Sequence, residues 1–238
     1  MLIVFIGGTY KPVGILGGMG PEATADLYLR IVRILQARGA KYDFEFPQII
    51  INSLPIPDLV ESPMYQKEIS RLLIDGVKQL ENSGAAFIAV ACNSVYSYFD
   101  EMQRAVPIPI INIMDETVKF ARKQKYTKIG LLATKTTIKN RLFEESFNKC
   151  NIDIINPTRN QQETITKVIL NILKGKKFFK DTLTLKSIII SLQNKGAEAV
   201  ILGCTELPLI LSTIDCDTNL IDTTEIIARK VIEKAKVN

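Results

Sequence analysis

The sequence predicts an α/β protein made of two similar halves, each with a parallel sheet. Short apolar runs rich in Val and Ile alternate with helical patterns along the chain, which is typical of parallel sheets. The chain also resembles itself, because residues 84–92 (GAAFIAVAC) and 196–204 (GAEAVILGC) both run from a Gly-Ala pair to a cysteine. A length of 238 residues is enough to bury one large core or two smaller ones.

The apolar runs define the expected strands. They lie at 13–16, 48–51, 87–91, 109–113, 128–133, 153–155, 199–202 and 219–221. The most regular helical pattern covers 65–83, where apolar residues recur three or four positions apart and Gly84 provides a stop. Another helix is expected over 23–38, because Pro21 suits a first helical position after a glycine-rich turn at 17–20.

Further echoes place the boundary between the halves. Residues 13–16 (VGIL) correspond to 129–132 (IGLL), and 111–113 (INI) to 219–221 (NLI). We therefore expect two Rossmann-like domains related by a pseudo-twofold axis, with the active site in the cleft between them. The first comprises 1–114 together with 220–238, because the last strand and helix are expected to cross back onto it, and the second comprises 115–219.

Composition excludes several classes of protein and site. The chain contains no histidine, which excludes a Ser-His-Asp triad, a Cys-His pair and a histidine-based metal site. The four cysteines form no CxxC pair, so we expect free thiols and no metal. A net charge of +5 without a concentrated basic tract does not indicate nucleic-acid binding. No apolar run is long enough to span a bilayer, and a soluble cytoplasmic protein is expected.

Two cysteines stand where chemistry is expected. Ligands of open parallel sheets bind beyond the carboxyl ends of the strands, and Cys92 and Cys204 both follow an expected strand. Both also precede expected helix starts, whose positive potential would lower a thiol pKa and attract a carboxylate. Two facing halves would put one thiol on each side of a ligand, as a racemase requires. A lone cysteine is more often a buried apolar residue, but the repeat favours chemistry; Cys150 and Cys216 have no such partner.

The glycine-rich turn has another interpretation. Residues 18–23 (GMGPEA) match a loose GxGxxA dinucleotide fingerprint after a strand. The following strand ends at Asn52 and Ser53 instead of the acidic residue that would bind a ribose, so an NAD(P) site is the weaker interpretation. A tight strand-to-helix turn explains the same glycines.

Several segments together resemble the aspartate/glutamate racemase family, and its aspartate racemases in particular. The resemblance extends over nearly the whole chain from about Pro12. The matching segments are 14–24 (GILGGMGPEAT), 56–58 (IPD), 92–94 (CNS), 131–134 (LLAT) and 203–206 (GCTE). Each segment alone is weak evidence, whereas the set is specific.

The resemblance implies a cofactor-independent racemase of aspartate or glutamate that forms a homodimer and binds a small anionic amino acid. Cys92 and Cys204 would be the two catalytic bases. The residues implied to bind substrate are Met19, Gly20, Asn93, Ser94, Thr134, Thr137, Lys174, Thr205 and Glu206. Glu206 would engage the substrate ammonium or influence Cys204, but it also suits the first turn of a helix. Thr134 and Thr137 could instead cap a helix, and a lone helix lysine such as Lys174 is usually solvated.

One departure from the family puts strict aspartate specificity in question. Aspartate racemases commonly carry an arginine directly after the IPD segment, where its guanidinium can bind the side-chain carboxylate, and Leu59 stands there in this chain. The alternatives are therefore another cysteine-pair isomerase, of the maleate isomerase or hydantoin racemase type, or an amino-acid-binding protein without catalysis.

Overall fold

The first half of the chain forms a three-stranded parallel sheet with helices on both faces. The computed structural model describes residues 10–57, 65–212 and 218–237. The sheet has the order β2-β1-β3. The elements of this half are β1 (Val13–Gly17), α1 (Pro21–Ala37), a 3-10 turn η1 (Asp43–Glu45), β2 (Ile49–Ser53), α2 (Gln66–Asn82), β3 (Phe87–Val90), the 3-10 turn η2 (Ser94–Tyr98), α3 (Phe99–Ala105) and α4 (Ile113–Lys123).

The second half repeats this plan with a four-stranded parallel sheet of order β5-β4-β6-β7. Its elements are β4 (Lys128–Leu132), α5 (Lys135–Lys139), α6 (Leu142–Asn148), β5 (Asp153–Ile155), α7 (Arg159–Leu173), α8 (Phe179–Asn194), β6 (Ala199–Leu202), the 3-10 turn η3 (Leu207–Leu209), β7 (Asn219–Asp222) and α9 (Thr223–Ala235). Strands β1, β2 and β3 thus correspond to β4, β5 and β6, and the predicted fold class is confirmed.

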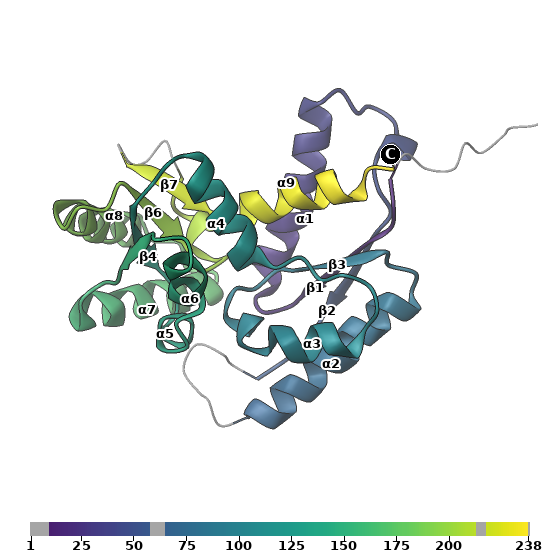
Figure 1. The fold of residues 1–238 in the computed structure, drawn as a ribbon, viewed down its shortest axis with the longest axis horizontal. Helices are drawn as coiled ribbons and strands as arrows, with labels where there is room; N and C mark the ends of the chain where they lie inside the picture. Colours follow the sequence, from purple (N-terminus) through teal and green to yellow (C-terminus); the bar gives the residue numbers. More distant parts are fainter. Residues whose placement is uncertain (1–9, 58–64, 213–217, 238) are drawn as a thin grey trace, which may run out of the picture.

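Both faces of the two central strands of the second sheet are buried, which explains why residues 129–132 of β4 and Ala199–Leu202 of β6 carry no polar side chains. Ile129 and Leu131 of β4 belong to the core shared with α4, α6 and α9, whereas Leu132 belongs to a separate core under α7 and α8. This alternation follows from the two-residue period of a strand. Figure 1 shows helices on both sides of this sheet, with α7 and α8 on the outer side.

The expected strand at 109–113 is reduced to a single bridge between Ile88 and Ile110. The Ile88 N–H donates to the Pro109 carbonyl, and the Ile111 N–H donates to the Ile88 carbonyl. Proline has no N–H to continue such a ladder, so Pro109 limits its length. The prediction of a strand here is wrong, although the segment occupies the place that β7 has in the second half.

The chain crosses between the halves twice. After the Ile110 bridge, α4 leaves the first half and packs on α6; after β7, α9 leaves the second half and packs on α1 as well as on α4. Figure 1 shows α9 reaching from the four-stranded sheet across the first half. The expectation that the last strand also joins the first half is wrong, because β7 pairs with β6 in the second sheet.

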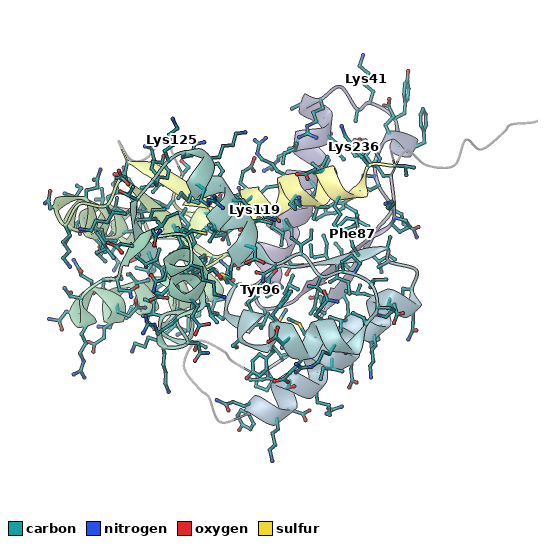
Figure 2. The ribbon with its side chains drawn as sticks, in the orientation of Figure 1. Lys41, Phe87, Tyr96, Lys119, Lys125 and Lys236 are labelled. Carbon is teal, nitrogen blue, oxygen red and sulfur yellow. The ribbon has the colours of Figure 1, made fainter. Side chains whose placement is uncertain are left out.

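Polar caps fix the start of both crossing helices. The Asn112 side chain accepts hydrogen bonds from the Met114 and Asp115 N–H groups at the start of α4. The Asp222 side chain accepts from Thr224 and Glu225 at the start of α9. Such caps satisfy N–H groups that have no partner within the helix. Figure 2 shows Tyr96 where the two halves meet, while Lys41, Lys125 and Lys236 lie toward the outside.

Candidate active site

A cavity of about 180 Å³ lies at the carboxyl ends of the strands of both sheets. Loops after β1, β2, β3, β4 and β6 contribute to its wall, and so does the end of α7. It is lined by Gly18, Met19, Gly20, Pro21, Ile56, Pro57, Cys92, Asn93, Ser94, Thr134, Leu173, Cys204, Thr205 and Glu206. At roughly 30 Å³ per water molecule, this volume suits a single small metabolite and not a peptide.

The two cysteines occupy equivalent positions in the halves. Cys92 follows β3 and Cys204 follows β6, each two residues beyond the end of its strand. Both are free thiols, only 6% and 5% exposed, and both line the cavity. The sequence repeat therefore corresponds to two thiols that share one cavity, each supplied by a different half.

The pKa of both thiols is raised, which is opposite to the sequence expectation. Burial, and then the negative charge of Glu206, raises the pKa of the Cys92 thiol to about 12. The same two causes hold the pKa of the Cys204 thiol well above its usual value. The helix starts expected after the cysteines are the 3-10 turns η2 and η3, which lack the aligned dipoles of a long helix. Backbone N–H groups of Ser94 and Val95 oppose the rise at Cys92 without cancelling it.

Glu206 connects one thiol to the glycine loop of the other half. The Cys204 thiol donates to Glu206 Oε2 over 3.0 Å, and the Thr205 hydroxyl donates to the same oxygen over 3.2 Å. Glu206 Oε1 accepts from the Gly20 N–H over 3.1 Å. A buried carboxylate needs such donors, and here they fix its position beside Cys204. Of the interpretations that the sequence offers, an influence of Glu206 on Cys204 is supported by this contact. The helix start is only the 3-10 turn η3, and contact with a substrate ammonium stays a prediction.

Hydroxyl groups join the halves on another side of the cavity. The Ser94 hydroxyl lies 2.8 Å from that of Thr134 and 3.1 Å from that of Thr137, and the two threonine hydroxyls are 3.0 Å apart. Thr134 also caps α5, since its side chain accepts from the Thr137 N–H. The capping alternative is thus confirmed for Thr134, which lines the cavity as well. The Asn93 amide donates to the Thr223 hydroxyl at the start of α9 over 2.9 Å.

The glycine loop between β1 and α1 is held tightly against its neighbours. The Gly18 N–H donates to the Thr24 hydroxyl, which donates in turn to the Gly20 carbonyl, both over 2.9 Å. A Cβ atom at Gly17 would lie 2.2 Å from Thr24. The loop thereby presents Met19 and Gly20 to the cavity, and its glycines are explained by close packing.

Most of the residues predicted for the site come together there. Nine line the cavity: Met19, Gly20, Cys92, Asn93, Ser94, Thr134, Cys204, Thr205 and Glu206. Thr137 is buried behind Thr134 and Ser94. Lys174 is exposed at the end of α7 and is not part of the lining. Leu59 and Cys216 lie outside the described residues.

Sequence reasoning missed the apolar part of the wall. Ile56 and Pro57 belong to a segment that carried the resemblance, although no role was assigned to them. Leu173 lines the cavity next to the exposed Lys174, and nothing in the sequence distinguishes this leucine from others on α7. Over the described ranges, no group of three or more Cys, Asp and Glu residues could hold a metal ion. No helix within them has both the length and the apolar character to cross a membrane.

Comparison with known proteins identifies the family. A sequence model of the family described as Asp/Glu/Hydantoin racemase matches residues 16–231. The chain belongs to this family. The match covers both halves and both cysteines, so the resemblance expected from short motifs is confirmed over most of the chain.

Individual relatives within the racemase family agree. The broad specificity amino-acid racemase RacX of Bacillus subtilis (strain 168) is 27% identical over 221 residues, which cover 92% of this chain and 96% of RacX. An aspartate racemase homologue from Pyrococcus horikoshii OT3 has 31% identity and a TM-score of 0.79, with 94% of this chain and 98% of that chain covered. Picrophilus torridus aspartate racemase has 26% identity and a TM-score of 0.83, covering 94% and 93%.

Proposed function

We propose that this protein racemises a free amino acid with Cys92 and Cys204 as its two acid–base groups. The observation that carries the proposal is that these thiols follow equivalent strands of the two halves and line one small cavity. Racemisation needs one group to remove a proton and another to return one on the opposite face. A thiol from each half would allow one group to remove the proton and the other to return it.

The proposed reaction has two proton transfers. A thiolate takes the α-proton, so the C–H bond breaks, an S–H bond forms, and the electron pair stays on the α-carbon and its carboxylate. The thiol of the other cysteine then gives its proton to the opposite face, which leaves that sulfur as the thiolate. The roles of Cys92 and Cys204 exchange for the reverse reaction, and no cofactor such as pyridoxal phosphate is needed.

Substrate binding must favour the thiolate, because burial and Glu206 raise the pKa of both thiols. The ammonium group of an amino acid would bring a positive charge into the cavity and oppose the effect of Glu206. The amide of Asn93 and the hydroxyls of Ser94, Thr134 and Thr205 would bind the α-carboxylate and ammonium group. Met19 and Gly20 form the wall beside them.

The proposal is tested by proton exchange in D2O. Loss of the α-proton NMR signal of an L-amino acid, with the D-isomer detected by chiral chromatography, would establish racemisation without added cofactor. We expect Cys92→Ser and Cys204→Ser each to lower the rate by at least about 10³-fold, since each removes one acid–base group. Cys150→Ser is the matched control and should leave the rate unchanged, because Cys150 does not line the cavity. Racemisation that survives loss of either site thiol would refute the mechanism.

A second candidate is hydantoin racemisation. The family description includes hydantoin racemases, and a neutral hydantoin ring would need no basic residue in this cavity. Chiral chromatography of a 5-substituted hydantoin in the same assay separates the two functions.

We also propose a cytoplasmic homodimer, as the family resemblance implies; light scattering of the purified chain tests the dimer.

A further inference from the structure

The cavity has an unusual charge for a site that would bind a dicarboxylic amino acid. Among its lining residues, Glu206 alone carries a charged side chain, and that charge is negative. The remaining polar side-chain groups there are the amide of Asn93, three hydroxyls and two thiols. These can serve one carboxylate and one ammonium group, but none is a cation that could neutralise a second carboxylate.

Basic side chains in other parts of the chain do not change this picture. Lys174 is exposed outside the lining, and Lys177 pairs with Glu22. Segments 1–9, 58–64 and 213–217, which the structure does not describe, contain no lysine or arginine in the sequence. Leu59, where aspartate racemases commonly carry an arginine, belongs to one of these segments. Of the lysines labelled in Figure 2, Lys41, Lys125 and Lys236 lie toward the outside, and Lys119 on α4 pairs with Glu116.

One part of the cavity wall is formed by apolar side chains. Ile56 and Pro57 come from the segment after β2, and Leu173 closes the wall from the end of α7. A Cβ atom on Gly20 would lie 3.0 Å from Leu173 Cδ2, so this leucine packs against the glycine loop of the other half. Leu173 is 43% exposed, so only part of its side chain is covered by this contact.

From this lining we infer that the substrate is an amino acid with an uncharged side chain, and not aspartate or glutamate. The inference rests on the proposed function and names its substrate class. A side-chain carboxylate would lose part of its hydration beside Ile56, Pro57 and Leu173 without gaining a counter-ion. It would also be repelled by Glu206 and by the thiolate that the reaction requires. An uncharged side chain meets neither cost.

The test compares three amino acids of nearly the same shape. L-aspartate, L-asparagine and L-leucine all carry two atoms on Cγ, so they differ in charge and polarity more than in size. We expect kcat/KM for deuterium incorporation to be on the order of 100-fold higher for asparagine or leucine than for aspartate. A ratio near one, or a preference for aspartate, would overturn the inference while leaving the racemase mechanism in place.

A binding measurement separates this inference from the proposed function. The double variant Cys92→Ser/Cys204→Ser cannot exchange protons by the thiol mechanism, and calorimetric titration gives its affinity for the same three ligands. Tighter binding of asparagine or leucine, with no exchange by the wild-type protein, would support the substrate class and refute racemisation. Failure of all three ligands to bind, together with no exchange by the wild-type protein, would overturn both.

Lysine variants identify the strongest competing explanation. If Lys174 folds over the cavity and pairs with a side-chain carboxylate, aspartate will be preferred, and Lys174→Met will remove that preference. Lys176→Met, the same change at another exposed residue of this segment, would not. That combination of results would overturn the inference and assign aspartate specificity to Lys174.

Discussion

At the scale of single residues, the contact between Cys204 and Glu206 determines how easily the site forms a thiolate. The thiol donates to the carboxylate over 3.0 Å, so the hydrogen bond favours the protonated sulfur. Cys92 experiences the charge of Glu206, but no hydrogen bond to it contributes to its pKa. The two thiols therefore differ in their contact with Glu206 before substrate binds.

Replacing Glu206 by glutamine should make both thiols more acidic. The negative charge of Glu206 raises both thiol pKa values, so its removal lowers them and increases the thiolate fraction at a given pH. We expect the alkylation of Cys92 and Cys204 by iodoacetamide to begin about one pH unit lower or more. Peptide mass spectrometry over a pH series measures each cysteine separately.

The control for this prediction is Glu233→Gln, the same change at a residue whose side chain is 71% exposed. Its alkylation profile should match that of the wild-type protein. If the racemisation proposed above is observed, the rising limb of its pH profile should move in the same direction in Glu206→Gln. Unchanged thiol reactivity in the variant would mean that Glu206 does not control the ionisation of the cysteines.

The sequence predicted which cysteines share the site but not their pKa. The repeat around Cys92 and Cys204 requires only that similar segments fold alike, and equivalent strand ends then follow. The pKa depends on burial and on Glu206, whose orientation is fixed by the distant Gly20 N–H. Local sequence contains no measure of either, so an argument based on helix starts gave the wrong direction.

At the scale of elements, the turn from β1 into α1 limits what residue 18 can be. Gly18 has φ +92°, and a Cβ there would lie 2.5 Å from the backbone N and O of Leu54. Gly84 has the same φ of +92° with nothing within 4 Å of such a Cβ. The two positions share the cost of a positive φ and differ only in the close approach of a neighbouring loop.

Alanine at these glycines should separate backbone strain from steric overlap. Gly84→Ala is expected to lower the free energy of unfolding by about 1 kcal/mol, for a positive φ alone. Gly18→Ala should cost about 2 kcal/mol more, because the loop must also move away from Leu54. Urea unfolding followed by circular dichroism measures both. Equal losses in the two variants would show that Leu54 yields freely.

Helices and strands were predictable because their periodicity is a local property of the sequence. The residues at which they end were less predictable. The helix expected at 65–83 is found as α2, whereas the strand expected at 109–113 fails at Pro109. The wall residue Leu173 could not be predicted, because its role depends on where the last turn of α7 meets the Gly20 loop. This contact between α7 and the Gly20 loop forms only when the two halves are packed together.

At the scale of the whole molecule, crossing helices fasten the halves together. Helix α9 begins at the end of β7 in the second sheet and packs on α1 of the first half. Arg30 of α1 reaches this junction and pairs with Asp222 over 2.7 Å, as well as with Asp26 and Glu225. The sequence indicated the crossing but placed it one element early, since similarity between 111–113 and 219–221 does not specify which sheet each segment joins.

Breaking this junction should destabilise the protein most at neutral pH. Burial raises the pKa of the Asp222 carboxyl, and Arg30 opposes that rise. Arg30→Met would raise this pKa further, so a charged Asp222 would destabilise the folded state at any pH above this pKa. We expect the free energy of unfolding to fall by about 1–2 kcal/mol at pH 7, a modest loss because both side chains are partly exposed. This loss shrinks as the pH falls through the raised pKa and the carboxyl becomes neutral.

A double-mutant cycle tests whether that loss belongs to the Arg30–Asp222 pair. Asp222→Asn keeps an oxygen that can accept from the Thr224 and Glu225 N–H groups, so the cap of α9 survives while the charge is lost. In the Asp222→Asn background, Arg30→Met should therefore cost less, by about 1 kcal/mol, and its pH dependence should largely disappear. Equal costs in both backgrounds would assign the effect to Asp26 and Glu225. A reduced cost would show that one partly buried charge pair couples the last strand of the second sheet to the first helix of the chain.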